Sequence, residues 1–407
     1  MIMANNNNKD KCNVPHLRFP EFTNEWEKCP LGLIADITKG NGISKEQLSA
    51  QGIPCILYGE LYTKYKSEII TEIYSKTALN PSVLVKSQAN DVIIPCSGET
   101  AIDISTARCV PYNNILLGGD LNIIRLKSQD GGFFAYQLNG VRKHDIARIA
   151  QGVSVVHLYG ENLKRIKVCY PSIEEQRKIT SLLSLIDERI ATQNKIIDKL
   201  QSLIKGLPHR IAKLGLQNTS WEKTLLANVL TERKELNTEL HSVFSVSVSE
   251  GVINQIEYLG RSFAAKDTSN YHVAHYGDII YTKSPTGDFP YGIIKQSHIE
   301  SNVAISPLYG VYIPISFEIG VYLHYYFMSA VSANNYLYSL VQKGAKNTIN
   351  ISNQRFLENR VPVPIIRSKI RNSAKALIAI QKKLSLEKKT LASLIAQKNH
   401  LLQQMFI

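Results

Sequence analysis

The chain has 407 residues, of which 44% are hydrophobic and 20% are charged. That length allows two or three domains, and the composition fits a globular chain and argues against disorder as the main state. A chain of this size buries enough surface to fold without disulfides or a metal. Lys and Arg number 47 against 34 Asp and Glu, a net charge of +13. This excess favours a polyanionic partner, nucleic acid before an anionic membrane surface, although a basic protein without such a partner remains an alternative.

Targeting signals and metal-binding patterns are missing from the sequence. No stretch approaches the roughly 18 consecutive apolar residues of a membrane span. The polar start, MIMANNNNKDKC, has no apolar signal region. The six cysteines form no C-x-x-C pair, which gives zinc little support. We therefore expect a cytoplasmic protein with reduced thiols and no membrane partner.

Four short motifs recur in the same order in the two halves of the chain. The pairs are Trp26–Lys28 and Trp221–Lys223, Asn90–Ile94 and Gly277–Tyr281, Gln151–Gly152 and Gln342–Gly344, and Ile166–Pro171 and Arg360–Pro364. Recurrence at similar offsets predicts a duplicated unit related by an approximate two-fold axis.

The larger part of each unit mixes short strands with a few helices. Strands are predicted at 53–58, 90–94, 121–126, 243–248, 277–281 and 310–314, and helices at 133–140 and 321–329. Short helical patterns follow each Trp-Glu-Lys motif, at 31–37 and 225–230. The mixture predicts an α/β (mixed α+β) domain in each half.

Each unit ends in a long helix with an apolar seam of period 3.5. The first begins at Pro171-Ser172 and is expected to stop at Gly206-Leu-Pro208, while the second begins near Arg367. The first seam is Ile179, Leu183, Ile186, Ile190, Ile197, Leu200 and Ile204, interrupted by Gln193; the second is Ile370, Ala374, Leu377, Leu384, Leu391, Ile395, Leu402 and Met405, interrupted by Gln381, Lys388 and Lys398. This period predicts two antiparallel helices of a left-handed coiled coil that separate the two mixed domains. Alternatively, each helix is a core element of its own domain.

These patterns divide the chain into five segments. They are a flexible N-terminus at 1–14, a first mixed domain at 15–170, a central helix at 171–214, a second mixed domain at 215–365 and a C-terminal helix at 366–407.

No catalytic or metal-binding set is recognisable. Gly344–Thr348 is too short for a phosphate-binding P-loop, and there is no H-E-x-x-H helix, G-x-S-x-G turn or Asn-Pro-Pro-aromatic tetrapeptide. His16, His144 and His157 each stand alone, and Cys96–Glu99 is better explained as a turn after a strand than as a nucleophile site. We therefore expect no catalytic residue, no metal and no cofactor bound by this chain.

Polar residues on predicted turns are candidates for DNA contact, because base edges are read by side chains that donate and accept hydrogen bonds. Solvation of ordinary loops is the alternative for any single residue. In the first half the candidates are Tyr58, Glu60, Tyr62, Ser97, Glu99, Thr100, Gln151 and Ser154. In the second half they are Ser247, Ser249, Lys283, Thr286, Asp288, Lys343, Lys346, Asn347 and Thr348. The basic C-terminal helix, whose one acidic residue is Glu387, is either a solvated face or a surface for DNA or an acidic partner.

At two segments the sequence resembles the specificity subunit of type I restriction–modification systems. The opening Pro15–Trp26 is similar to the start of such subunits, and Pro171–Ile179 fits the family's Pro-x-x-x-Glu-Gln-x-x-Ile segment at the start of its central helix. With the duplicated plan, the resemblance covers nearly the whole chain. Pro364–Ile370 in the second copy lacks the Glu-Gln pair, so its helix start and partner contacts can differ from those of the first copy.

This resemblance implies a non-catalytic subunit of a multisubunit enzyme. Each mixed domain is then a target recognition domain that reads one half of a split, asymmetric site in double-stranded DNA, and the helices fix the gap between the halves. The partners implied are two adenine-N6 methyltransferase subunits and the restriction subunits; S-adenosylmethionine, ATP and Mg belong to those partners. The alternatives are an enzyme with degenerate motifs and a coiled-coil scaffold or regulatory DNA-binding protein without methyltransferase partners.

Overall fold

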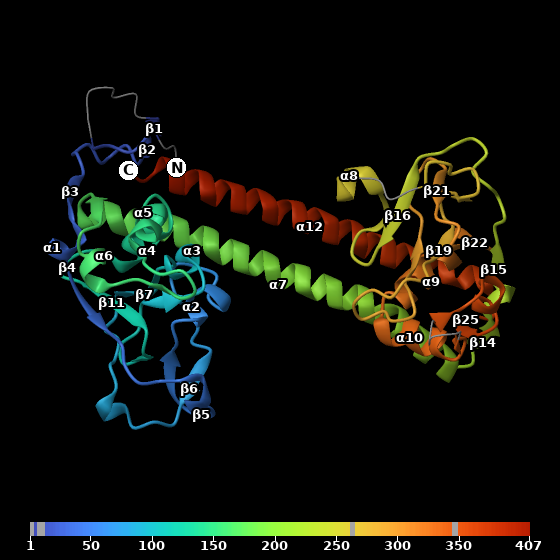
Figure 1. Cartoon of the computed structure of the whole chain (residues 1–407), viewed down its shortest axis with the longest axis horizontal. Coiled ribbons are helices and arrows are strands. Elements are labelled where there is room, and N and C mark those ends of the chain that lie inside the picture. The colour runs from blue at the N-terminus through green and yellow to red at the C-terminus, as the bar shows by residue number, and fades with distance from the viewer. Residues whose placement is uncertain (1–3, 6–12, 261–264, 344–348) are drawn as a thin grey trace. The chain divides into compact units, whose positions relative to one another are not determined.

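A computed structural model of the chain describes residues 4–5, 13–260, 265–343 and 349–407 (Figure 1). The chain divides into unit 1, residues 1–194 and 390–407, and unit 2, residues 195–389. The long helices α7 (Ile173–Gln217) and α12 (Ile370–Gln404) are each divided between the two units, with one part of the helix in unit 1 and the other part in unit 2. Within the described residues, no helix is both long and apolar enough to cross a membrane.

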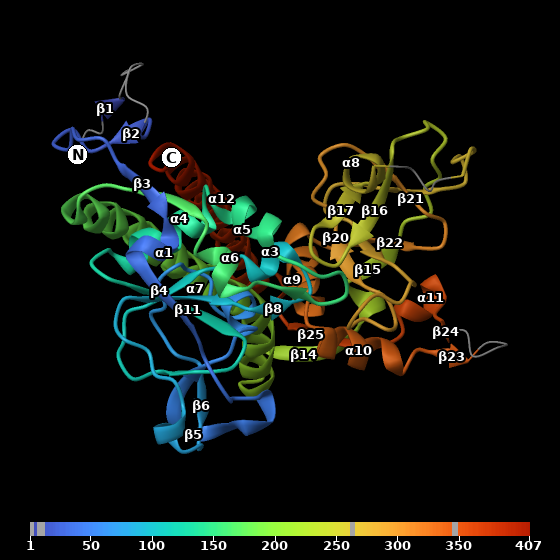
Figure 2. The ribbon, with the colours of Figure 1, turned by 60° about the vertical axis from the view of Figure 1, so that its left-hand side comes forward.

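Unit 1 is built from short strands and helices around a small central sheet (Figures 1 and 2). The strands are β1 (Ala4–Asn5), β2 (Leu17–Arg18), β3 (Glu27–Pro30), β4 (Ala35–Lys39), β5 (Leu48–Ile56), β6 (Ser75–Thr77), β7 (Asp91–Pro95), β8 (Ser97–Gly98), β9 (Arg108–Val110), β10 (Leu116–Leu117), β11 (Leu121–Leu126), β12 (Val156–His157) and β13 (Lys167–Tyr170). The helices before α7 are α1 (Leu31–Ile34), η1 (Lys45–Gln47), α2 (Glu60–Thr63), η2 (Pro81–Val83), α3 (Ala101–Ile104), α4 (Gly131–Asn139), α5 (Lys143–Ile149) and α6 (Gly160–Leu163).

Unit 2 repeats this mixture of elements. Its strands are β14 (Trp221–Leu225), β15 (Leu230–Glu232), β16 (Val243–Ser247), β17 (Gly251–Asn254), β18 (His272–Ala274), β19 (Ile279–Tyr281), β20 (Ile294–Gln296), β21 (Val303–Ile305), β22 (Gly310–Pro314), β23 (Gln342–Lys343), β24 (Ile349–Asn350) and β25 (Arg360–Pro364). Its helices are η3 (Leu226–Asn228), α8 (Gln255–Leu259), α9 (Phe317–Phe327), α10 (Ala330–Tyr338), α11 (Asn353–Phe356) and η5 (Arg367–Lys369).

The two units share one sheet topology. The central sheet of unit 1 has the order β4-β11-β7-β9, that of unit 2 the order β15-β22-β19-β20, and every pairing in both is antiparallel. A second sheet in each unit contains a parallel pair, β5 with β10 and β16 with β21. Trp26 packs edge-on against Phe133 in unit 1, as Trp221 does against Tyr322 in unit 2. The predicted mixed fold and its internal duplication are therefore confirmed.

Most predicted elements of the domains are found near their expected bounds, because their apolar residues form the core. β7 is buried along its whole length, and α4 is covered on all sides by the core of unit 1. The short helical patterns after the two tryptophans were right only in part. Ile37 and Leu230 lie in β4 and β15, where they join the edges of the central sheets instead of extending α1 and η3.

The predicted stop of the central helix at Gly206-Leu-Pro208 is wrong, because α7 continues through Pro208 to Gln217. A proline inside a helix costs a hydrogen bond and disfavours the turn before it. Packing in unit 2 offsets that cost. The ring centroids of His209 and Tyr326 are 4.8 Å apart. A Cβ added to Gly215 would stand 2.0 Å from the ring of Trp221, so this turn of the helix packs closely against the domain.

Within each unit, α7 and α12 pack side by side and run in opposite directions. In unit 1, Met405 shares a core cluster with Ile179 and Leu183, which lie near the start of α7. In unit 2, Leu384 and Ile204 line one cavity. The antiparallel pairing was thus predicted correctly.

The seam of α12 differs in two places from its prediction. The heptad predicts Lys388 on the seam, but the buried residue is its neighbour Glu387. It also predicts Ile395, but that side chain is 43% exposed and the neighbouring Leu394 is half-buried instead. At both places the inward-facing position lies one residue closer to the N-terminus of the helix than the heptad predicts.

Candidate nucleic-acid interface

Three predicted turns of unit 1 meet at one edge of the domain. β8 pairs with β12, which brings Ser97 opposite His157. Gln151 and His157 exchange two backbone hydrogen bonds of 2.9 and 2.7 Å, which close the turn between them. Tyr62 reaches the same place, with its hydroxyl 3.6 Å from where a Cβ on Gly98 would stand. Residues far apart in sequence thus form one polar surface, here called the unit 1 edge.

The tip of the unit 1 edge is the turn 151–155, and it projects into solvent. Gly152 has φ +119°, and a Cβ there would lie 2.1 Å from the carbonyl oxygen of Val155, so the turn requires glycine. Val153 is 96% exposed, and Gln151 and Ser154 are exposed beside it. An exposed apolar side chain between polar ones suits contact with a thymine methyl group or insertion at a base step. Val153 was missed by the sequence reasoning, which looked for polar residues alone.

Cations surround this turn. Arg148 and Arg165 line a cavity of about 270 Å³ together with Gln151 and Asn162. Lys39 is exposed on β4 and close enough to Cys96 for its charge to act on that thiol. Arg165 has no ion pair with any residue that the structure describes. Positive charge near this turn would attract phosphate groups.

Some predicted contact residues of unit 1 are occupied within the fold. Glu60 is buried, accepts the Leu57 N–H at 3.1 Å and pairs with Lys64 at 2.6 Å. Thr100 caps α3 by accepting the Asp103 N–H at 3.1 Å. Ser97 is buried in β8. Glu60 and Ser97 therefore shape the unit 1 edge from inside, and Thr100 is exposed but engaged as a helix cap; Glu99, Gln151 and Ser154 are exposed on the edge.

Tyrosines form the remaining part of the edge. Tyr58 and Tyr62 are half-buried around α2. Burial raises the pKa of Tyr62, and the neighbouring Tyr58, Asp103 and Glu99 add to this effect. Tyr62 therefore stays protonated at neutral pH and can both donate and accept a hydrogen bond.

In unit 2 the predicted residues gather at two turns. Ser247 and Ser249 lie on the β16–β17 hairpin with their hydroxyl oxygens 3.3 Å apart. Thr286 pairs with Phe289 across a tight turn that contains Asp288. Ser249 and Asp288 line the same cavity, so these two turns meet.

The other predicted residues of unit 2 are placed differently. Lys343 belongs to β23, whose pairing of Gln342 with Asn350 matches that of Gln151 with His157 in unit 1. Lys346, Asn347 and Thr348 lie outside the described residues. Burial lowers the pKa of Lys283, which faces the charge of Glu232 on β15.

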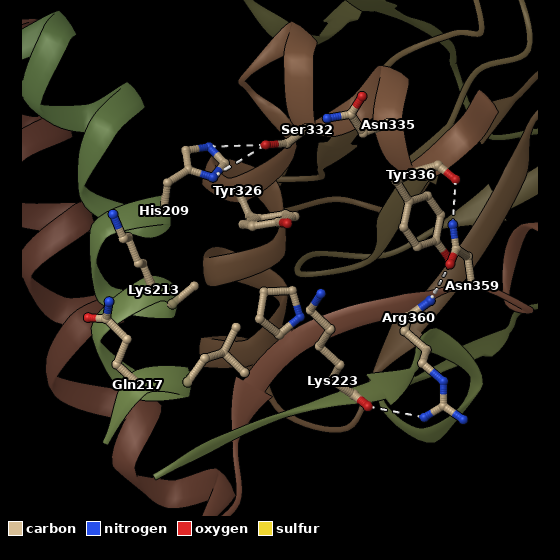
Figure 3. A pocket seen from close by; sticks show the side chains of 13 residues that line it. His209, Lys213, Gln217, Lys223, Tyr326, Ser332, Asn335, Tyr336, Asn359 and Arg360 are labelled. Carbon is tan, nitrogen blue, oxygen red and sulfur yellow. Dashed lines mark hydrogen bonds between the residues drawn. The ribbon is translucent and has the colours of Figure 1, made fainter. Parts of the chain in front are cut away.

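A second cationic surface in unit 2 could not be foreseen, because its residues are scattered in the sequence. A cavity of about 750 Å³ is lined by His209 and Lys213 of α7, by Lys223 of β14 and by Arg360 of β25 (Figure 3). Arg360 donates a 3.1 Å hydrogen bond to the Lys223 carbonyl, and His209 lies against Ser332. No acidic residue is among those that line this cavity, so it suits an anionic group.

Two groups bear on the chemistry of the unit 1 edge: the Cys96 thiol and clusters of metal-ligating side chains. Burial raises the pKa of Cys96 to about 11, so its thiol is not an activated nucleophile at neutral pH. Among the residues that the structure describes, no three His, Cys, Asp or Glu side chains are grouped to hold a metal ion.

Comparison with known proteins identifies the type of domain. Residues 23–202 match the family described as type I restriction modification DNA specificity domain. The chain is 24% identical over 217 residues to the type I restriction enzyme MjaVIII specificity subunit of Methanocaldococcus jannaschii, a match that covers 52% of this chain and spans about half, 47%, of that subunit. Its fold is similar to that of a type I restriction–modification S subunit from M. genitalium, whose crystal structure gives a TM-score of 0.63. The two chains are 17% identical, and the match covers 97% of this chain and 99% of that one.

Proposed function

Since residues 23–202 match the family described as type I restriction modification DNA specificity domain, we propose that this chain is a specificity subunit that selects the DNA sequence on which a type I restriction–modification enzyme acts. It binds double-stranded DNA at a bipartite, asymmetric site, and each recognition domain, 15–170 and 215–365, reads one half. The helices 171–214 and 366–407 set the spacing between the halves. The chain itself supplies recognition and no catalysis.

The duplicated sheet is the observation that carries this proposal. Two domains with one topology but different surface residues are suited to read two different half-sites. The net charge of +13 and the cations around the unit 1 edge supply attraction to phosphates. Exposed Glu99, Gln151 and Ser154 offer hydrogen bonds to base edges.

We further propose that the chain recruits two adenine-N6 methyltransferase subunits, which use S-adenosylmethionine, and ATP- and Mg-dependent restriction subunits. The helices α7 and α12 support this part of the proposal, because they carry exposed apolar residues such as Leu185 and Leu386 besides their buried seams. Such residues on a long helix suit the docking of partner helices.

The decisive experiment co-purifies the chain with its cognate methyltransferase subunit and maps methyladenine by single-molecule sequencing. Methylation at one split motif is the expected result. A continuous half-motif would show that only one domain reads DNA. A stable complex without methylation would leave an assembly or regulatory role, and the absence of a complex would contradict recruitment. Cleavage or methyl transfer by the chain alone would indicate an enzyme instead.

The turn at Gly152 provides a focused prediction. Gly152→Ala should lower affinity for the specific duplex about tenfold or more, on the scale of one lost base contact, because a Cβ would collide with Val155 and distort the tip. Anisotropy titrations at fixed salt measure this loss. Gly206→Ala is the control, since a Cβ there meets nothing within 4 Å. Equal affinity of the Gly152 variant and the wild type would remove this turn from the interface.

A further inference from the structure

A cavity of about 700 Å³ lies in unit 2 between the domain and its two helix segments. Its walls come from α7 and α12, from the hairpin β16–β17, from the turn at Asp288 and from the start of α10. Three lysines, Lys205, Lys295 and Lys388, line it against one acidic residue, Asp288. Its volume falls within the range of small-molecule sites.

Lys295 is the unusual member of this lining. It sits on β20 opposite Ile280 and is only 5% exposed. Its side-chain ammonium group makes no hydrogen bond or ion pair with any residue that the structure describes. Burial of the ammonium group without a counter-charge lowers the pKa of Lys295 to about 8. An unpaired buried charge is costly, and such a group is normally paired or bound to a ligand.

Unit 1 shows how this position is satisfied when the protein provides the partners. Arg108 occupies the same place in the sheet, opposite Ile93, as Lys295 does opposite Ile280. The Arg108 guanidinium donates to the carbonyls of Leu61 at 3.1 Å and Tyr65 at 2.8 Å. It also lies within the electrostatic reach of Glu68 and Asp187. No carboxylate of the described residues forms an ion pair with Lys295, although Asp288 lines the same cavity, so the ammonium is open to an anion that enters it.

We propose that this cavity binds a phosphate group, with Lys295 as the buried cation at its wall. Lys205 and Lys388, both exposed, add positive charge from the two helices, and the hydroxyls of Ser249 and Ser329 are available as donors. The phosphate is carried either by a small molecule such as a nucleotide or by the DNA backbone. This inference goes beyond sequence recognition and holds for a small ligand even if the proposed function fails.

Thermal unfolding of the full chain with inorganic phosphate or AMP tests the proposal. Phosphate or AMP should raise the Tm of the wild type with a saturable concentration dependence, beyond the effect of chloride at equal ionic strength. Lys295→Met should have a higher Tm than the wild type without anions, because an unpaired buried charge is removed, and should not respond to phosphate. Lys234→Met, at an exposed position of the same unit, is the matched control and should behave as the wild type.

The source of the phosphate is separated by a second titration, with duplex DNA. If free phosphate and AMP have no effect while Lys295→Met weakens duplex binding and lowers the salt slope by about one, the DNA backbone is the ligand. Stabilisation by AMP that DNA does not displace identifies the small molecule. Equal responses of wild type and Lys295→Met to all three probes would overturn the proposal, as would a Tm of the variant below the wild type at every phosphate concentration.

Discussion

Lys398→Met is expected to destabilise unit 1 by about 3–5 kcal/mol, the usual cost of breaking a buried ion pair by removing one partner. Lys398 lies on the part of α12 that belongs to unit 1 and is almost completely buried. Its Nζ donates to Glu68 Oε2 at 2.5 Å and to Asp187 Oδ1 at 2.6 Å. Tyr136 donates a further hydrogen bond of 2.7 Å to Asp187. Without the cation, two carboxylates remain buried next to each other.

The pH dependence of this variant follows from the pKa shifts of the group. Burial lowers the pKa of Lys398, but Glu68 and Asp187 outweigh burial and raise it. Burial, and then the charge of Glu68, raises the pKa of Asp187. Because folding raises the pKa of Lys398, its ion pairs stabilise the wild type fully at pH values below the pKa of an unfolded lysine. That stabilisation is lost as the pH rises through the pKa of Lys398 in the folded protein. In Lys398→Met the deficit should shrink as pH falls through the pKa of Asp187, since protonation removes the repulsion.

Urea unfolding at several pH values measures both effects. Lys389→Met, at an exposed position of the same helix, is the control and should change stability by less than about 0.5 kcal/mol. The double variant Lys398→Met, Asp187→Asn should recover part of the loss, because one buried charge remains instead of two. A Lys398 variant as stable as the wild type at neutral pH would show that the ion cluster is unimportant for the fold.

Exchange of the segment Trp221–Pro364 for that of a relative should change one half of the methylated motif completely and leave the other half unchanged. The segment closes on itself, because Trp221 and Pro364 are paired neighbours at the end of the β14·β25 ladder. The exchanged segment contains all described buried residues of the main hydrophobic cluster of unit 2 except Ile370. The exchanged piece therefore carries its own core and its own surface turns.

Methyladenine mapping of the chimera with the methyltransferase subunit provides the measurement. The donor must keep a tryptophan at position 221, because Gly215 of α7 is fitted to that ring. A chimera that carries only the donor's residues 243–305, with β14 and β25 unchanged, is a second variant should the first fail to fold. A change in both halves of the motif would refute independent reading by the two domains.

Much of the fold is present in local sequence patterns. The apolar runs at 90–94 and 121–126 became β7 and β11, and 310–314 became β22, because such runs favour central strands; β7 is buried along its whole length, and β11 and β22 are buried over most of theirs. The repeated Trp-Glu-Lys motif located equivalent tryptophans in both cores. The end of α7 could not be predicted this way, since Pro208 is a local stop signal that only packing against unit 2 overrides.

The candidate site was predictable in its turns and less so in its chemistry. Polar turns at 97–100 and 151–154 were recognised, and the structure brings them together through β8 and β12. Sequence patterns did not separate Glu60, which is engaged inside the fold, from Glu99, which is exposed. They also did not identify Val153, because a single valine in a sequence gives no sign of whether its side chain is exposed or buried.

By itself, the sequence determined the duplication, the mixed fold, the two long helices and the basic charge, because these features follow from periodicity and composition that can be read over short stretches of chain. Only the tertiary structure decided which charges are paired. Arg108 and Lys295 hold the same place in their sheets, yet one has carbonyl and carboxylate neighbours and the other lines an open cavity. The partners of a buried charge come from residues distant in sequence, such as Lys398 with Glu68, and only folding brings these together.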